Sequence, residues 1–303
     1  MNDYINDISS LLSEGTITAN ALLREYTTFR VGGPAKLLVK LADATELSTI
    51  VGYLNKHKIE YMIIGNGSNL LVSDKGYDGV VLHMVKKLAD VHVADDYIEA
   101  GAGAMLSFVC SLARDNELSG MEFAYGIPGT VGGAMVMNAG AYGKEMRDVV
   151  DSVWVLDSVG NERILTNSEM NFAYRHSIIS DQKLIVTKAR FKLNHGNKDE
   201  ISQTMQELME KRLSKQPLEY PSAGSTFKRP EGYFAGKLIE DAGLKGTRIG
   251  GATVSDKHCG FIVNDRKGCA KDIDTLIRLV TDKVEASFGV RLEPEVIRVG
   301  NFD

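Results

Sequence analysis

An eighteen-residue stretch from Gly126 to Gly143 constrains this chain more than any other part of its sequence. It reads Gly-Ile-Pro-Gly-Thr-Val-Gly-Gly-Ala-Met-Val-Met-Asn-Ala-Gly-Ala-Tyr-Gly and carries no charged side chain. A surface linker would be rich in Ser, Lys or Glu, and a membrane-spanning helix would be longer and richer in Leu, Ile and Val. Glycine lacks the Cβ atom that keeps other groups away from the backbone. The stretch therefore predicts a loop whose N–H groups bind a phosphate or the polar edge of a cofactor ring, or else a tightly packed turn inside a sheet.

The composition indicates a soluble cytoplasmic protein. The chain has 303 residues, of which 44% are hydrophobic and 25% charged, enough for two or three domains. Its net charge of −5 argues against a nucleic-acid or anionic-membrane partner. Cys110, Cys259 and Cys269 form an odd set without metal-ligand spacing, which fits a reducing compartment and predicts no metal site. The first residues do not resemble a signal peptide, and no apolar run is long enough to span a bilayer.

Hydrophobic patterns predict a small α/β unit in the first 84 residues. Residues 1–24 read as a short helix with a polar lead-in, and residues 35–40 read as a strand after a turn signal. Asp43 and Glu46 predict a capping box for a helix over 44–57. Residues 61–64 and 80–84 are apolar runs typical of buried strands.

The rest of the chain divides into two further regions. In the middle region the predicted elements are a strand over 97–103, a helix over 104–116 with Met105, Phe108, Val109 and Leu112 on one face, and strands over 149–157, 162–165 and 184–193. In the last region two helices are predicted, one with Ile201, Met205, Leu208, Met209 and Leu213 on one face and one with Ile273, Leu276, Ile277, Val280 and Val284 on one face. A loop over 221–230 and a strand over 259–263 lie between them. The last predicted element is a strand over 292–299, in which Pro294 marks a strand start or an edge.

A second glycine loop, Gly65-Asn-Gly-Ser-Asn69, follows the strand over 61–64, where open α/β sheets bind ligands. It lacks the third glycine and the long helix of a Rossmann fingerprint. Its consecutive N–H groups predict an anion nest for a pyrophosphate, or a plain turn. Two glycine loops, each closing its own α/β unit, favour a ligand with two ends, and FAD fits this arrangement better than a mononucleotide.

Seven sequence blocks in this order resemble those of the UDP-N-acetylenolpyruvoylglucosamine reductases. The blocks are Tyr26-Thr-Thr-Phe-Arg-Val-Gly-Gly, Gly65-Asn-Gly-Ser-Asn-Leu-Leu-Val, Gly126-Ile-Pro-Gly-Thr-Val-Gly-Gly-Ala, Asn138-Ala-Gly-Ala-Tyr-Gly, Tyr174-Arg-His-Ser, Ala223-Gly-Ser-Thr-Phe-Lys and Leu292-Glu-Pro-Glu-Val. The resemblance covers nearly the whole chain. It implies an α+β fold with a two-subdomain FAD-binding region of the PCMH/vanillyl-alcohol-oxidase type and a separate α/β substrate-binding domain. The implied division is 1–84 with the strand 292–303 returning to it, 85–198, and 199–291.

The resemblance also implies an activity. It is that of an NADPH-dependent flavoprotein reductase of peptidoglycan precursor synthesis, monomeric and cytoplasmic, without nucleic-acid or membrane partners. NADPH reduces the FAD, and the flavin then reduces the enolpyruvyl ether of UDP-N-acetylglucosamine to give UDP-N-acetylmuramate. Neither Cys nor His occurs in 65–69 or 126–137, so the sequence predicts non-covalent FAD.

Three residues take catalytic roles by their positions in the resembling blocks. Arg175 would stabilise enolate-like charge with its planar guanidinium, Ser225 would donate a proton to the carbanionic carbon, and Glu295 would polarise the enol region. Each also has an ordinary interpretation, namely a surface ion pair, a turn serine and a solvent-facing strand carboxylate. Glu293 would point to the same face as Glu295, so only the resemblance distinguishes them.

The resemblance also assigns binding roles by position. The predicted cofactor-binding residues are Arg30, Gly65, Asn66, Gly67, Ser68, Asn69, Gly126, Ile127, Pro128, Gly129, Thr130, Gly132, Gly133, Asn138, Gly140 and Ala141. The predicted substrate-binding residues are Tyr174, Lys228, Arg229 and His258. Candidates for the substrate pyrophosphate are Lys211, Arg212, Lys215, Lys228, Arg229 and Lys237, with Lys228 preferred. Some relatives carry Asn at the position of Arg229, and His258 also reads as a turn residue.

Two other functions compete with this reductase. One is a different FAD-dependent oxidoreductase of the same fold, such as an oxidase or a 2-hydroxy-acid dehydrogenase, and the other is a non-catalytic sensor of nucleotide sugars. The presence of Arg175, Ser225 and Glu295 in matching blocks argues against both. The interval between Arg175 and Ser225 is too short for the tyrosine-bearing insertion of some relatives, so the chain resembles the shorter, type II form.

Overall fold

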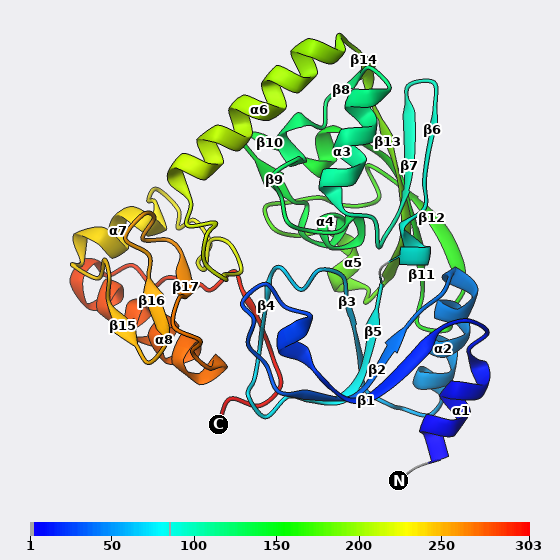
Figure 1. The fold of residues 1–303 in the computed structure, drawn as a ribbon, viewed down its shortest axis with the longest axis horizontal. Coiled ribbons are helices and arrows are strands. Elements are labelled where there is room, and N and C mark those ends of the chain that lie inside the picture. The colour runs from blue at the N-terminus through cyan, green and yellow to red at the C-terminus, as the bar shows by residue number, and fades with distance from the viewer. Residues whose placement is uncertain (1–2, 85) are drawn as a thin grey trace. The chain divides into compact units, whose positions relative to one another are not determined.

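The computed structural model describes residues 3–84 and 86–303, in which helices and strands alternate along the chain (Figure 1). Two compact units are present. Unit 1 comprises Met1–Ala19, Leu37–Gly65 and Gly79–Lys211, and unit 2 comprises Asn20–Lys36, Asn66–Asp78 and Arg212–Asp303. The chain therefore passes between the two units several times.

The N-terminal elements include a four-stranded sheet with the order β1-β2-β5-β3. Its strands are β1 (Thr16–Leu22), β2 (Pro34–Lys40), β3 (Tyr61–Ile64) and β5 (Tyr77–His83), and β3 runs parallel to β5. The predicted strands over 35–40, 61–64 and 80–84 are thus confirmed. The prediction of one helix within 1–24 holds for α1 (Asp3–Leu11) and is wrong for the strand β1. The β-branched run Thr16-Ile-Thr favours an extended backbone there.

Helix α2 (Ala44–Lys56) begins at Asp43, whose carboxylate accepts hydrogen bonds from the N–H groups of Thr45 and Glu46. The predicted N-cap is therefore confirmed. The other contact of a capping box, from the Asp43 N–H to the Glu46 side chain, was also predicted and is wrong. The Glu46 side chain is buried and accepts instead from the N–H groups of Ala42 and of residues 13–15, and from the Ser13 hydroxyl. Burial opposes ionisation of Glu46, yet these hydrogen bonds hold its pKa below the usual value.

We expect Glu46→Gln to lower the free energy of unfolding by about 2 kcal/mol. The substituted amide places an NH2 group where the carboxylate now accepts the Ala42 N–H, 2.8 Å from Oε2. Urea unfolding measures the change, and Glu60→Gln, at an exposed position of the same unit, is the matched control. Equal effects of the two substitutions would contradict the role given to Glu46.

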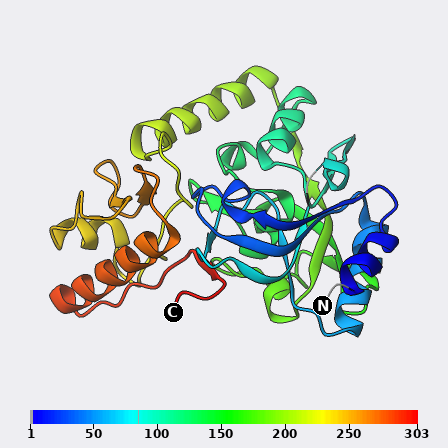
Figure 2. The same ribbon diagram turned by 60° about the horizontal axis from the view of Figure 1, so that its bottom comes forward.

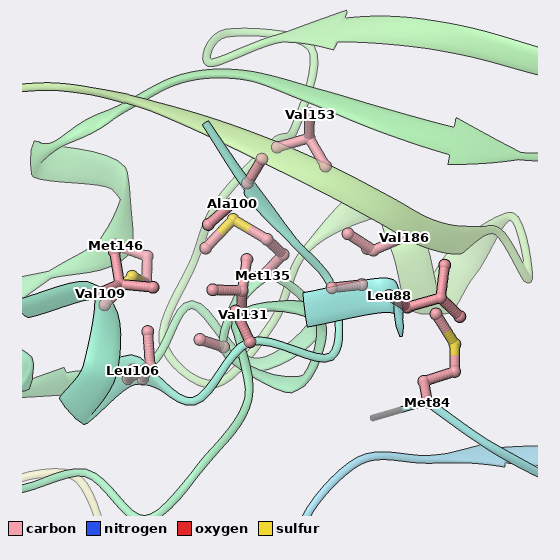
Figure 3. Close-up of a cluster of buried hydrophobic side chains, with 14 of the residues drawn as sticks. Met84, Leu88, Ala100, Leu106, Val109, Val131, Met135, Met146, Val153 and Val186 are labelled. Carbon is pink, nitrogen blue, oxygen red and sulfur yellow. The ribbon is translucent and has the colours of Figure 1, made fainter. Parts of the chain in front are cut away.

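The middle of unit 1 is a five-stranded antiparallel sheet with the order β12-β11-β13-β7-β6. Its strands are β6 (Val91–Ala94), β7 (Tyr97–Gly101), β11 (Val150–Leu156), β12 (Glu162–Thr166) and β13 (Ile185–Lys192). The predicted strands of this region are therefore confirmed to within a few residues. Helices α3 (Leu106–Asp115) and α4 (Val131–Met137) pack their apolar side chains against this sheet (Figure 3).

Two details of this region differ from the sequence prediction. Helix α3 buries Leu106, Val109, Cys110 and Ala113, whereas Phe108 is 52% exposed. Both sets have the i, i+3, i+4, i+7 spacing and differ by a shift of one residue, so the periodicity alone does not distinguish the two faces. The glycine-rich stretch also contains a helix that was not predicted: α4 begins at the N-cap Thr130 and buries Val131, Ala134 and Met135. The glycines between Val131 and Ala134 interrupt the apolar pattern that would otherwise have predicted a helix.

The remaining elements of unit 1 are short, apart from α6. They are the helix α5 (Ile178–Asp181), the strands β8 (Leu118–Ser119), β9 (Gly140–Ala141), β10 (Lys144–Glu145) and β14 (Asn194–His195), and the 3₁₀ turns Lys86–Ala89, Glu122–Ala124 and Met146–Asp148. Helix α6 (Lys198–Lys215) leads from unit 1 into unit 2. Only Ile201 and Met205 of its predicted apolar face are buried, and Leu213 is exposed.

Unit 2 contains a three-stranded antiparallel sheet, β15 (Arg248–Ile249), β16 (Ala252–Val254) and β17 (Ile262–Asn264), with α7 (Ala235–Asp241) and α8 (Ala270–Phe288) beside it (Figures 1 and 2). Helix α8 buries all five residues of the predicted face and ends at Gly289 in the left-handed conformation. Unit 2 also contains β4 (Leu70–Val72), which pairs in parallel with β18 (Ile297–Val299), and a 3₁₀ turn at Leu23–Glu25.

The predicted strands over 259–263 and 292–299 are only partly confirmed. Regular strand structure begins at Ile262 in one and at Ile297 in the other. Pro294 has no N–H to donate to a ladder, which fits the later start of β18. Among the described residues, no helix is both long enough and apolar enough to cross a membrane.

Candidate active site

In unit 1 the glycine-rich stretch lies against the end of strand β3. Gly65 follows β3 directly, and a Cβ atom added to it would lie 2.3 Å from Oγ1 of Thr130. Thr130 is buried, and its hydroxyl accepts a hydrogen bond from the N–H of Gly133. Only glycine therefore fits at residue 65 while Thr130 keeps this position. Gly65, the first residue of the loop 65–69, and Thr130, in the stretch 126–143, are thus in close contact within unit 1.

The neighbouring glycines Gly132 and Gly133 differ in what surrounds them. A Cβ atom on Gly132 would come within 3.0 Å of Ala102 and would crowd it, so packing explains this glycine. A Cβ atom on Gly133 would come no closer than 3.7 Å to Thr130, and Gly133 lies inside helix α4, where alanine would be more stable. The fold therefore does not require glycine at 133. The open space at Gly133 fits the close approach of a bound group such as the expected cofactor.

His83, at the end of β5, is partly buried and forms a hydrogen bond with the main chain of Gly65. Burial and the nearby charge of Lys40 lower its pKa to about 4, although the hydrogen bond acts in the opposite direction. The imidazole is therefore neutral at physiological pH. Sequence patterns gave no indication of this contact with the glycine loop, because it depends on the parallel pairing of β3 with β5.

Acid should destabilise the protein through His83. Because its folded-state pKa of about 4 lies below the ordinary histidine value of 6.5, the unfolded chain binds more protons between these values. Stability is then complete above pH 6.5 and falls as the pH drops toward 4. Between about pH 7 and about pH 5 the free energy of unfolding should fall in both proteins. We expect the fall to be about 1 to 2 kcal/mol smaller in His83→Asn than in the unaltered chain, after allowance for solvent screening. Urea unfolding at the two pH values measures this, and parallel pH curves would contradict it.

Tyr174 and Arg175 form the tip of a tight hairpin. Ala173 and His176 exchange main-chain hydrogen bonds of 3.0 and 3.2 Å. Arg175 adopts the left-handed conformation with φ 54°, where Gly and Asn are the usual residues. Its guanidinium carbon lies 5.0 Å from the centre of the Tyr174 ring. Several other non-glycine residues of the described chain share a positive φ, so the backbone conformation alone assigns no role to Arg175.

In unit 2 the second part of the other glycine loop packs against the Tyr26–Gly33 block. Gly67 has φ 58°, and a Cβ atom on it would lie 2.0 Å from the carbonyl oxygen of Tyr26. The N–H of Thr28 donates to the carbonyl of Gly67. The Thr28 hydroxyl is buried and has no hydrogen-bond partner within residues 3–84 and 86–303. A polar cofactor atom would remove the cost of this unpaired group, so these residues also fit FAD.

Ser225 and Glu295 lie on adjacent segments of unit 2. The N–H of Glu295 donates to the carbonyl of Thr226, and the N–H of Lys228 donates to the carbonyl of Glu293, both at 2.8 Å. This short antiparallel pairing brings the neighbours of Ser225 next to Glu295, although the two lie far apart in sequence. Ser225 is exposed and Glu295 is half-buried.

The loop residue Asn69 lies on the other side of Glu295. Its amide donates to the carbonyl of Glu295 at 3.2 Å, and its own carbonyl accepts from the N–H of Ile297 at 2.9 Å. The main chain at Glu295 is thus held between the serine loop and Asn69. The resemblance implied a cofactor contact for Asn69, whereas no local sequence pattern predicts its link to Glu295.

The predicted substrate residues of unit 2 differ in their surroundings. Lys228 places its ammonium 3.2 Å from the Glu293 carboxylate, at an exposed position. The Arg229 guanidinium lies over the Phe234 ring, 4.1 Å from its centre. His258 accepts the N–H of Gly260 through Nδ1, and burial lowers its pKa. These contacts are those of a turn residue. The contact of His258 with the substrate stays a prediction.

The remaining predicted cofactor residues lie in both units. Arg30, in unit 2, has a positive φ of 56°. In unit 1, Gly140 and Ala141 form strand β9, whereas Gly126, Ile127, Pro128 and Gly129 lead into α4. Asn138 ends α4 and is fully buried. Among the described residues no group of three or more His, Cys, Asp or Glu is placed to bind a metal ion.

Comparison with known proteins first defines the class. A model of the FAD-binding domain matches residues 35–166. The solved structure of Phl p 4.0202, a glucose dehydrogenase, superposes on 64% of this chain and 44% of its own with a TM-score of 0.51 and 15% identity, a likeness of fold alone. The chain is thus an FAD-binding α+β protein with the flavin-binding fold of the PCMH/vanillyl-alcohol-oxidase type, as the sequence predicted.

Relatives that match nearly the whole chain then define the family. A model of the UDP-N-acetylenolpyruvoylglucosamine reductase C-terminal domain matches residues 216–299. The reductase of Caldanaerobacter subterraneus subsp. tengcongensis is 50% identical over 98% of both chains, and that of Agathobacter rectalis is 47% identical over 99% of both. The crystal structure of the Thermus caldophilus enzyme has a TM-score of 0.81 and 36% identity over 95% of this chain and 99% of its own. The chain belongs to the UDP-N-acetylenolpyruvoylglucosamine reductase family.

Proposed function

We propose that this chain reduces the enolpyruvyl ether of UDP-N-acetylglucosamine to UDP-N-acetylmuramate with NADPH, as a step of peptidoglycan precursor synthesis. The observation that carries the proposal is the pairing of the serine loop with the Glu295 segment, which brings together an acid candidate and a carboxyl group. An oxidase or a 2-hydroxy-acid dehydrogenase of the same fold would have no use for a proton donor of this kind.

FAD, when bound, would supply the hydride-transfer chemistry between NADPH and the substrate. The residues that would hold it are Gly65, Thr130 and Gly133 in unit 1, and Thr28 and Gly67 in unit 2. Gly133 leaves room for close approach, and the buried Thr28 hydroxyl offers a hydrogen bond. The other cofactor residues predicted from the sequence extend these two sets.

The protein's own task is to stabilise charge and supply a proton. Hydride addition to one carbon of the C=C bond leaves negative charge on the other carbon and on the conjugated carboxylate. In the proposed mechanism Arg175 pairs with this carboxylate, because a guanidinium is a permanent, planar double donor. Ser225 donates its hydroxyl proton to the carbanionic carbon, and Glu295 polarises the enol region. Lys228 and Arg229 bind the pyrophosphate, and Tyr174 contacts the substrate.

We also propose three properties that extend this function. The chain acts as a monomer in the cytoplasm, where a reducing environment keeps thiols such as Cys110, Cys259 and Cys269 free. Residues 1–84 with 292–303, and residues 85–198, form the two FAD-binding subdomains, whereas 199–291 bind the substrate. The substrate is bound without the tyrosine-bearing insertion of the longer relatives.

The visible absorption spectrum of the purified protein tests the function. We expect flavin bands that pass into the supernatant after acid precipitation, bleach with NADPH under anaerobic conditions and return when the UDP-enolpyruvyl sugar is added. Return of colour with a 2-hydroxy-acid's oxo product would indicate the oxidoreductase alternative. Binding of the sugar without recovery of colour would indicate a sensor.

A further inference from the structure

The Arg175 hairpin is attached to the end of helix α4 through a buried asparagine. Nδ2 of Asn138 donates to the carbonyl of Ala173 at 3.1 Å and also to the Glu145 carboxylate. Its Oδ1 accepts from the N–H of Arg147 at 3.0 Å. Both amide hydrogens are thus used by protein partners, so a side-chain donor contact from Asn138 to FAD would have to replace one of them.

A second buried side chain holds the other stem of the hairpin to the same helix. The hydroxyl of Ser177 donates to the carbonyl of Val136 at 2.9 Å, and Ser177 is fully buried. Ala173 and Ser177 lie on either side of the Tyr174-Arg175 tip. The two stems are therefore each tied to the last turn of α4, whose core position is fixed by Val131 and Met135 (Figure 3).

This attachment matters because of the backbone at Arg175. A two-residue turn with arginine in the left-handed conformation is unfavourable on its own, and it persists only if the surroundings hold it. We propose that Asn138 and Ser177 are positioning residues, which fix the turn and so aim the Arg175 guanidinium at the substrate. The proposal rests on the proposed catalytic role of Arg175.

Three variants separate the attachment from general stability. Asn138→Gly removes the side-chain hydrogen bonds and leaves the left-handed backbone at φ 42° unstrained, because glycine adopts it freely. Ser177→Ala removes the second attachment. Asn55→Ala is the control, since it removes side-chain hydrogen bonds of unit 1 away from the hairpin, to the Tyr61 hydroxyl at 3.2 Å and to the Ser158 carbonyl at 2.5 Å.

The attachment is measured by trypsin, which cleaves after arginine. On the FAD-loaded proteins we expect cleavage of the Arg175–His176 bond, followed by mass spectrometry, to be about tenfold faster in Asn138→Gly and Ser177→Ala than in Asn55→Ala. In stopped-flow experiments the same two variants should slow flavin reoxidation by the UDP-enolpyruvyl sugar about 10- to 100-fold. Ser177→Ala, which lies outside the predicted cofactor residues, should leave flavin reduction by NADPH unchanged. In an Arg175→Met background, Asn138→Gly should add little further loss.

The outcomes distinguish this proposal from the proposed function. If Arg175→Met slows reoxidation but Asn138→Gly and Ser177→Ala do not, only the positioning role is overturned. Additive losses in the double variant overturn it as well, because the residues would then act independently of Arg175. If Arg175→Met itself reoxidises normally, the catalytic role of Arg175 fails and the positioning role fails with it. Should Asn138→Gly not fold, Ser177→Ala alone decides by the same measurements.

Discussion

Replacing Ser225 with alanine is expected to slow reoxidation of the reduced flavin by the UDP-enolpyruvyl sugar about 100- to 10,000-fold, while reduction by NADPH stays nearly intact. The substitution removes the hydroxyl proton that the carbanionic carbon would receive. It leaves hydride transfer from NADPH untouched, because that step requires no proton from Ser225. Anaerobic stopped-flow spectroscopy at the flavin band separates the two half-reactions.

Two further variants check that the effect belongs to the hydroxyl. Ser222→Ala alters the same loop three residues earlier and should change neither half-reaction. Ser225→Cys keeps a transferable proton on a more acidic group and should recover part of the lost rate. Equal loss in both half-reactions of Ser225→Ala would remove Ser225 from the role of proton donor.

Gly133→Ala is expected to act in opposite directions on the protein and on its cofactor. The protein leaves room for the added methyl group, and alanine is favoured over glycine inside a helix, so the apoprotein should gain up to about 1 kcal/mol of stability. The same methyl group would occupy the space into which FAD packs, and we expect the FAD dissociation constant to rise about tenfold or more.

Thermal unfolding of the apoprotein and a fluorescence titration with FAD measure these two effects. Gly132→Ala is the contrasting variant, since its methyl group would press on Ala102 and should destabilise the apoprotein. An FAD affinity unchanged by Gly133→Ala would show that the open space at residue 133 does not face the cofactor.

Sequence reasoning succeeded where a local pattern carries the information. The five buried residues of α8 recur at helical spacing, and Asp43 combines a cap residue with the start of an apolar helix, so both elements could be predicted. Helix α4 could not, because its glycines are present for contacts outside the helix and conceal its apolar stripe. The face of α3 was misplaced because an exposed phenylalanine was counted with the apolar face.

The candidate site shows the same limit more strongly. The resembling blocks supplied Arg175, Ser225 and Glu295, but not what holds them. The hydrogen bond of Asn69 to Glu295, that of Asn138 to Ala173 and that of His83 to Gly65 each join segments that are distant in the chain or separated by a turn. Such contacts depend on strand pairing and loop closure, which a single sequence does not display as a pattern.

The composition of unit 2 from three separate chain segments has a consequence for biosynthesis. Strand β4 is translated early, whereas its parallel partner β18 lies among the last residues to leave the ribosome. The first two segments of unit 2 contact each other, but they must wait for the third segment until all of unit 1 has been made. Such long-range closure is slow relative to local folding, so completion of unit 2 should limit how quickly a newly made chain becomes active.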